Sequence, residues 1–122
     1  MGPTAAEMAI YRASARKREQ QRRDRLYRRY QLGLAVAQQA ARQLRQDFHA
    51  ERVVLFGSMR SPAKVHERSD VDLAVWGLDP RAYFRAVGQL LAIDPDMPID
   101  LIEAESAPPR ILAEIAATGV DL

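Results

Sequence analysis

Two short stretches decide the fold: residues 52–58 read RVVLFGS, and residues 70–76 read DVDLAVW. The first is a β-branched and aromatic run that ends at a glycine, which is typical of a buried strand that stops at a turn. The second alternates acidic and apolar residues, so it predicts another strand. The two strands together predict a sheet with a glycine-serine turn and two aspartates among its strand ends.

The two aspartates of the second stretch are Asp70 and Asp72. Side chains two residues apart on a strand point to the same face of the sheet. Two carboxylates so close together repel each other unless a cation lies between them. Hard oxygen ligands favour magnesium or manganese over zinc. The alternative is a strand end with two solvated aspartates.

A third aspartate, Asp100, lies in the apolar segment 99–102, which predicts a third strand. If that strand lies beside residues 70–76, Asp100 joins Asp70 and Asp72. Three carboxylates around one or two metal ions are the apparatus of in-line phosphoryl or nucleotidyl transfer. The alternative for Asp100 is a strand-edge residue paired with an arginine.

The dipeptide Gly57-Ser58 follows the first strand directly. A glycine at this point lets the backbone approach a ligand closely. The serine then offers a hydroxyl and a backbone N–H group to phosphate oxygens. A phosphate-binding turn and a metal site therefore share one end of the predicted sheet.

The N-terminal third of the chain predicts a long helix, because residues 4–48 contain no proline and one glycine, Gly33. An apolar stripe at spacings of three and four predicts that the second half of this helix packs on the domain. The stripe comprises Tyr27, Tyr30, Leu34, Ala37, Ala41, Leu44 and Phe48. Residues 16–29 are rich in arginine, and this part is expected to project or to cover a partner. Gly33 is the expected break between the two parts, with one continuous helix as the alternative.

The C-terminal half predicts two further helices and a loop between them. Asp79-Pro80 is typical of a helix start. Pro108-Pro109 starts a last helix, and Gly119 is its expected end. The expected inward residues are Tyr83, Val87, Leu90 and Leu91 in the first of these helices, and Ile111, Leu112 and Ile115 in the last. The expected order is α, β, β, α, β, α, which is a single small α/β domain without internal repeats.

Composition excludes several classes of protein. A chain of 122 residues suits one compact domain, and 48% hydrophobic with 28% charged residues indicates a soluble globular protein. The absence of cysteine excludes disulfides, thiolate zinc sites and a cysteine nucleophile, and it agrees with a reducing cytoplasm. No signal sequence or apolar stretch of about 18 residues is present, so we expect a cytoplasmic protein without a membrane-spanning segment.

The net charge of +2 conceals an asymmetry between the two parts of the chain. Residues 1–50 contain eleven Lys/Arg against four Asp/Glu, a balance of +7. Residues 51–122 contain seven against twelve, a balance of −5. The basic part suggests nucleic acid or an acidic partner. The acidic part is more typical of carboxylates that hold cations.

The motifs LFGS at 55–58, RSDVDLAV at 68–75 and IDL at 99–101 resemble the signature of the DNA polymerase β-like nucleotidyltransferase superfamily. Within this superfamily, the short chain is most similar in length to the minimal nucleotidyltransferases (MNT), which are antitoxins of HEPN ribonuclease toxins. This resemblance covers residues 35–122 and implies an α/β (α+β) fold with a small mixed sheet and flanking helices. The long N-terminal helix predicted above is added to this fold, and its basic part, residues 12–29, has no counterpart in the minimal domain. The resemblance divides the chain into a basic helical extension, residues 1–33, and a minimal nucleotidyltransferase domain, residues 34–122.

The resemblance also implies roles for individual residues. Asp70, Asp72 and Asp100 would be catalytic and hold Mg²⁺, with two ions expected, and Asp100 would complete the metal site or act as the base. The residues expected to contact the nucleotide are Gly57, Ser58, Arg60 and Ser69. The implied reaction transfers AMP from ATP to a tyrosine hydroxyl of the cognate HEPN toxin, with which the chain would form a hetero-oligomer.

The loop 59–69 departs from the family pattern in two ways. It contains eleven residues where relatives usually have ten, and its Met59-Arg60-Ser61-Pro62 segment lacks the glycine that many relatives carry there. Arg60, Lys64 and Arg68 are available to face the phosphates, or they are solvated loop charges.

Three alternative functions remain open from the sequence. The first is a non-catalytic antitoxin of the same fold that inhibits its toxin by binding. The second is transfer to a small molecule such as an aminoglycoside, although the chain lacks the extra domain that usually builds such a pocket. The third is a nucleic-acid-binding regulator, which the basic helix makes possible but which the sequence does not favour.

Overall fold

The structure is a computed structural model that describes all residues, 1–122. Its main elements are α1 (Ala5–Phe48), β1 (Arg52–Phe56), β2 (Val71–Trp76), α2 (Tyr83–Leu91), β3 (Ile99–Glu103), α3 (Pro109–Thr118) and β4 (Val120–Asp121). Short 3₁₀ helices cover Ser58–Arg60, Pro80–Ala82 and Ala104–Ser106. The predicted order of helices and strands is confirmed, with β4 added at the C-terminal end.

The four strands form one mixed sheet in the order β3-β2-β1-β4. Strand β1 runs antiparallel to β2 and to β4, whereas β2 and β3 are parallel. In this register Phe56 is opposite Asp72, and Asp72 is opposite Asp100. The second and third strands are therefore neighbours, which was the condition for Asp100 to lie near Asp72, and the mixed α/β fold class is confirmed.

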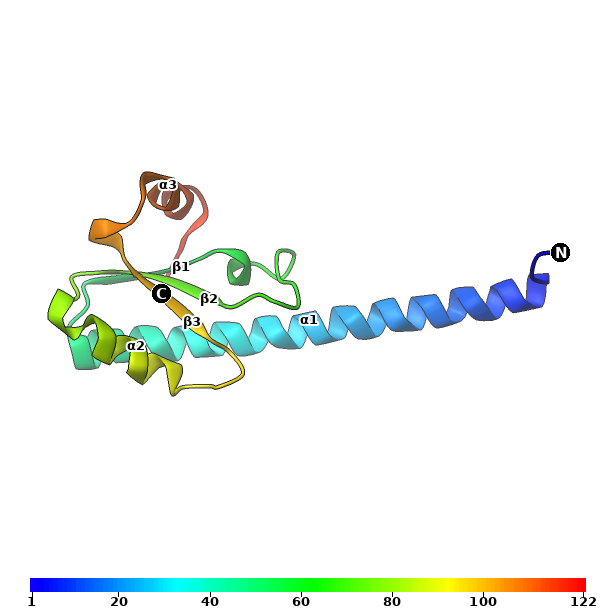
Figure 1. The fold of residues 1–122 in the computed structure, drawn as a ribbon, viewed down its shortest axis with the longest axis horizontal. Coiled ribbons are helices and arrows are strands. Elements are labelled where there is room, and N and C mark those ends of the chain that lie inside the picture. The colour runs from blue at the N-terminus through cyan, green and yellow to red at the C-terminus, as the bar shows by residue number, and fades with distance from the viewer.

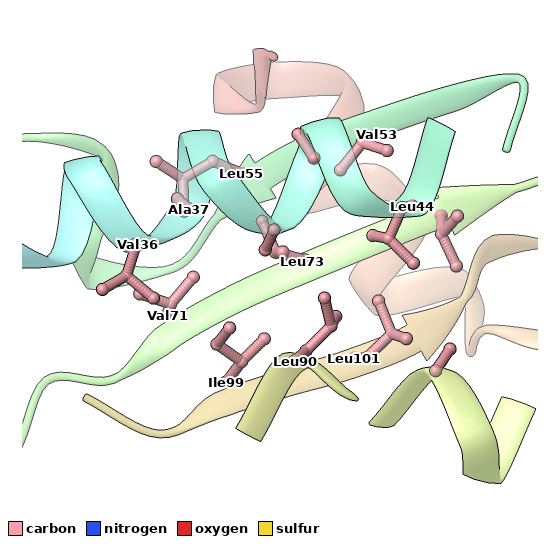
Figure 2. Packing of buried hydrophobic residues seen from close by; sticks show 14 of the residues in the cluster. Val36, Ala37, Leu44, Val53, Leu55, Val71, Leu73, Leu90, Ile99 and Leu101 are labelled. Carbon is pink, nitrogen blue, oxygen red and sulfur yellow. The ribbon is translucent and has the colours of Figure 1, made fainter. Parts of the chain in front are cut away.

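Helices cover the sheet on both faces (Figure 1). The second half of α1 and α2 cover one face, where the main core lies. Figure 2 shows sheet residues such as Val53, Leu73 and Leu101 in contact with this layer, into which Leu44 and Leu90 project from the two helices. On the other face α3 places Ile115 against a smaller cluster with Val54, Phe56 and Ala74. Alternate residues of the strands thus pack into two hydrophobic cores, one on each face of the sheet.

Helix α1 is a single helix of 44 residues, about 66 Å long at 1.5 Å per residue. Its start is capped by Thr4, whose hydroxyl accepts a hydrogen bond from the Glu7 N–H at 3.1 Å. The expected break at Gly33 is wrong, and the continuous alternative holds. Gly33 instead leaves room for the buried side chain of Met59, which an added Cβ would displace.

Three residues expected to face inward are more exposed than predicted. Tyr27 is 54% exposed because it lies where α1 only begins to reach the domain, next to the partly buried Leu26 and Tyr30. Leu91 is the last residue of α2 and is 47% exposed. Leu112 is 38% exposed, since the short α3 buries Ile115 and only part of Ile111. Asp70, expected inside a strand, precedes the first residue of β2.

None of the helices, α1 included, combines the length and the apolar character that crossing a bilayer requires.

Candidate active site

A pocket of about 460 Å³ opens where the end of β1 meets the starts of β2 and β3. Asp72 and Asp100 line it, together with Gly57 and with Glu114 from α3. Phe56, Ile102 and Ile111 form an apolar wall. The register explains this grouping: Phe56, Asp72 and Asp100 are opposite one another on three adjacent strands, so their side chains share the face covered by α3.

Asp72 is the most electrostatically perturbed group of the pocket. Its pKa is raised to about 6, chiefly by desolvation and then by the negative charges of Asp100, Asp70 and Glu114, in that order. Burial and like charges both disfavour the ionised form of a carboxylate. Asp72 therefore lies in a region of excess negative charge, which a cation would relieve.

Asp70 lies at the edge of this region rather than in the pocket. Its carboxylate forms an ion pair with Arg29 of α1, with 3.4 Å between Asp70 Oδ1 and Arg29 Nη2. The Nε of the same arginine donates a hydrogen bond to the backbone oxygen of Ser69 at 2.9 Å. The side chain of Asp70 is thus held toward α1, although its charge still acts on Asp72.

Gly57 brings the backbone close to the carboxylate of Asp72. Its φ of 74° and ψ of −159° lie in a region that is open essentially to glycine alone. A Cβ at this position would overlap the carboxylate of Asp72. Gly57 therefore brings the backbone and Asp72 together at the mouth of the pocket.

Ser58 and Ser69 hold the loop rather than line the pocket. The Ser58 hydroxyl donates to the Ser69 hydroxyl at 2.7 Å. The same Ser69 oxygen accepts from the His66 N–H at 2.8 Å, and Ser69 is 2% exposed. Arg60 and Asp70 also lie outside the pocket lining. The loop is anchored by the buried Met59, which lies against α1 at Gly33.

Two residues with a place at this site were missed by sequence reasoning. Glu114 follows Ile111 by three residues and precedes Ile115, so helical spacing alone puts it near the inner face of α3. Arg29 precedes the buried Gly33 and Val36 by four and seven residues, which places it on the packed face of α1. Its position within an arginine run concealed this signal.

The donor chemistry of the site fits a hard divalent cation. Asp72 and Asp100 offer carboxylate oxygens from adjacent strands, and Asp70 and Glu114 are near enough to raise the pKa of Asp72. Such oxygen ligands are those that Mg²⁺ prefers. No three acidic or histidine side chains are gathered closely enough to hold a metal ion as they stand.

The family profile described as "Polymerase beta, Nucleotidyltransferase" matches residues 38–122, which is most of the chain and includes all residues of the pocket. The chain belongs to the polymerase β nucleotidyltransferase family. A search of curated proteins found no significant match for this nucleotidyltransferase.

Solved structures share its fold. A chain of a toxin-antitoxin complex with AMP-PNP is 25% identical, with a TM-score of 0.55, and the match covers 68% of this chain and 69% of that chain. A mutant toxin-antitoxin complex, MntA-HpeT, matches at 22% identity, a TM-score of 0.57 and 70% coverage of both chains. The Shewanella oneidensis complex of a tri-AMPylated HEPN toxin with an MNT antitoxin matches at 22% identity and a TM-score of 0.54, covering 73% and 70%.

The nucleotidyltransferase should lose order in its loop when Arg29 is truncated. In Arg29→Ala we expect the Ser69 amide, which donates to the His66 carbonyl oxygen, to exchange its hydrogen about tenfold faster. Tenfold corresponds to about 1.4 kcal/mol, near the lower end for a hydrogen bond from a charged donor. Hydrogen-exchange measurements check this.

The neighbouring variant Arg28→Ala is the matched control, since Arg28 is exposed and forms no ion pair. Equal exchange rates of the Ser69 amide in both variants would contradict the role of Arg29.

The metal-free nucleotidyltransferase should lose stability as pH rises from about 4 to 6. The raised pKa of Asp72 means that the folded state binds more protons than the unfolded state in this window, so the free energy of unfolding decreases with pH. Asp72→Asn removes this loss. We expect the variant to be more stable by about 1 kcal/mol at pH 7, a value discounted for solvent screening, or roughly 4 °C in Tm.

Thermal melts in EDTA check this expectation between pH 3 and 8. The Tm difference between the two proteins should vanish as pH falls to about 3, because Asp72 is then largely protonated in both folded and unfolded chains. If the Tm difference between the two proteins does not depend on pH, ionisation of Asp72 does not destabilise the folded state.

Proposed function

We propose that this nucleotidyltransferase is the antitoxin of a HEPN toxin and that it neutralises the toxin by transferring AMP from ATP to a tyrosine hydroxyl. The observation that carries the proposal is the pairing of Asp72 and Asp100 across β2 and β3, in an acidic pocket beside Gly57. The fold shared with toxin-antitoxin complexes, one of them with AMP-PNP and another with a tri-AMPylated toxin, supports it.

In this proposal Asp72 and Asp100 would hold Mg²⁺ in the pocket, and Asp70, which is paired with Arg29, would join them on release of that pair. Bound Mg²⁺ supplies charge neutralisation on the triphosphate. The backbone at Gly57 and Ser58 has room to approach the phosphates because Gly57 carries no side chain. Ser69 contributes indirectly, because its hydroxyl accepts a hydrogen bond from the Ser58 hydroxyl and so positions Ser58. Arg60 is half-buried in the same loop, and we retain it as a phosphate contact.

The proposed step is a substitution at the α-phosphorus of ATP. The tyrosine oxygen forms a bond to this phosphorus, and the bond from it to the bridging oxygen of the β-phosphate breaks, which releases pyrophosphate. The hydroxyl proton passes to the carboxylate of Asp100, which is exposed and therefore accessible to an incoming acceptor. Asp72, less exposed, contributes a fixed negative charge in the pocket.

The proposed catalytic domain is residues 34–122, because every residue that lines the pocket lies within it. Residues 1–33 then form a basic extension that contributes Arg29 to the loop. We further propose that the protein acts as a hetero-oligomer with its toxin in the cytoplasm, where ATP and a ribonuclease's RNA substrates are found.

The test is transfer of label from α-³²P-ATP to the purified cognate toxin. With Mg²⁺ we expect label on the toxin, its loss on addition of EDTA, and peptide mapping to a tyrosine. The same toxin should then lose its ribonuclease activity. Full inhibition of the toxin without any label, and without ATP, would overturn transfer and leave inhibition by binding as the function.

A further inference from the structure

The first half of α1 extends away from the domain into solvent (Figure 1). Every residue of 5–25 is exposed except Ala15, which is partly so. Contacts with the domain begin with an ion pair between Arg22 and Glu67 and continue at Leu26, Arg29 and Tyr30. We call residues 5–28 the arm. The proposed reaction gives the arm no role, because no residue of the arm lines the pocket.

The arm carries an unbalanced positive charge. Residues 12–28 contain eight Lys/Arg against two acidic residues, Glu19 and Asp24. Glu19 forms ion pairs with Arg22 and Arg23, and Arg22 also reaches Glu67. The remaining six form no ion pair: Arg12, Arg16, Lys17, Arg18, Arg25 and Arg28. These six cations are available to an anionic partner.

The arm does not have the pattern of a helix that docks into a protein groove. Such a helix carries an apolar stripe at positions i, i+3, i+4 and i+7. Between Arg12 and Arg25 the only apolar residues are Ala13 and Ala15. The basic residues also surround the helix, since the consecutive Arg16, Lys17 and Arg18 point in three directions at 100° intervals. The partner must therefore present negative charge on more than one side of the helix.

We propose that the arm binds double-stranded DNA by lying in its major groove. A helix with side chains is about 10–12 Å across, and the major groove of B-form DNA is about 12 Å wide. Phosphates flank this groove on both edges, which matches cations on several sides of the arm. Its 24 residues span about 36 Å, close to one helical turn of DNA. The major groove of A-form RNA is too narrow for a helix.

Binding of this kind rests on phosphate contacts and releases counterions. Each phosphate that a basic side chain neutralises contributes about −0.9 to the slope of log K against log salt. If four of the six unpaired cations are removed, we expect a slope less steep by about 3 to 4. The affinity at 100 mM salt should fall at least about 100-fold.

The experiment measures fluorescence anisotropy of a labelled 24-base-pair DNA duplex with the full-length protein between 50 and 300 mM KCl. The arm variant combines Arg12→Gln, Arg16→Gln, Lys17→Gln and Arg18→Gln, since glutamine preserves helix propensity. A control variant with the same change in net charge combines Arg42→Gln, Arg81→Gln, Arg85→Gln and Arg110→Gln, all outside the arm. Circular dichroism verifies that both variants keep their helix content.

The expected result is loss of DNA binding in the arm variant and retention in the control variant, with AMP transfer to the toxin unchanged in the arm variant. Equal losses in both variants would overturn the proposal in favour of a non-specific effect of net charge. Tighter binding to a single-stranded or duplex RNA of equal length would overturn it in favour of RNA. Absence of DNA binding by the unaltered protein, with toxin binding lost in the arm variant, would assign the arm to the toxin. Because DNA binding is measured without ATP, the outcome does not depend on whether AMP is transferred.

Discussion

We expect Asp72→Asn to reduce the rate of the proposed AMP transfer to the toxin at least about 1,000-fold. Asp72 lines the pocket between Gly57 and Asp100, and its carboxylate is the group that most needs a cation. An amide offers one neutral oxygen, so the substitution removes a charge that, in the proposed reaction, would help to hold Mg²⁺ against the triphosphate. Charge stabilisation by a metal contributes several kcal/mol, and about 4 kcal/mol corresponds to a factor of 1,000.

The matched control for this prediction is Asp96→Asn, because Asp96 is an exposed aspartate in the loop before β3 and lies outside the pocket. Single-turnover labelling of the toxin measures both variants at saturating ATP. Gel filtration with the toxin verifies that the complex still forms. If Asp72→Asn retains more than a tenth of the transfer rate, Asp72 is not a metal ligand in the reaction.

Gly57→Ala is expected to damage both the fold and the site. The backbone of Gly57 adopts a positive φ with an extended ψ, which costs any other residue about 1–3 kcal/mol. In addition, the new Cβ would overlap the carboxylate of Asp72, so that Asp72 must move or β1 must separate from β2 at this end. We expect the free energy of unfolding to fall by about 2 kcal/mol or more and AMP transfer to fall below a hundredth of its normal rate.

Gly88→Ala provides the control, since nothing lies within 4 Å of a Cβ at that position and α2 is regular there. An alanine in a helix interior is favoured over glycine by about 0.8–1 kcal/mol, so this variant should be slightly more stable and fully active. Urea unfolding and toxin labelling compare the two variants. Normal stability and activity of Gly57→Ala would show that the turn tolerates a side chain and that close approach is not its role.

Local patterns were enough to predict the strands, because each central strand has a clear alternation or an apolar run that ends at a glycine. They also predicted that Asp72 and Asp100 meet, on the condition that β2 and β3 are neighbours. Strand β4 was not predicted, because a strand of two residues is too short to show an alternation of apolar and polar residues. The contact of Arg29 with Ser69 and Asp70 joins positions about forty residues apart, and no local pattern reports such a contact.

The same limit explains the errors in burial. Helical spacing places Tyr27 on the stripe, but spacing does not say where along the helix the sheet begins. The anchoring of the loop 59–69 is another long-range contact that local patterns do not report. Met59 is buried against Gly33, so this loop is anchored to α1 by a side chain.

The absence of a break at Gly33 makes α1 a stiff spacer. From residue 15 to residue 40 the helix measures about 37 Å, with no hinge in between. A partner bound to the N-terminal part of α1 would therefore fix both the distance to the nucleotidyltransferase domain and the orientation of that domain. A flexible linker would fix neither of them. An insertion of two residues in the solvent-exposed part would rotate one end against the other by about 200° while leaving each end intact.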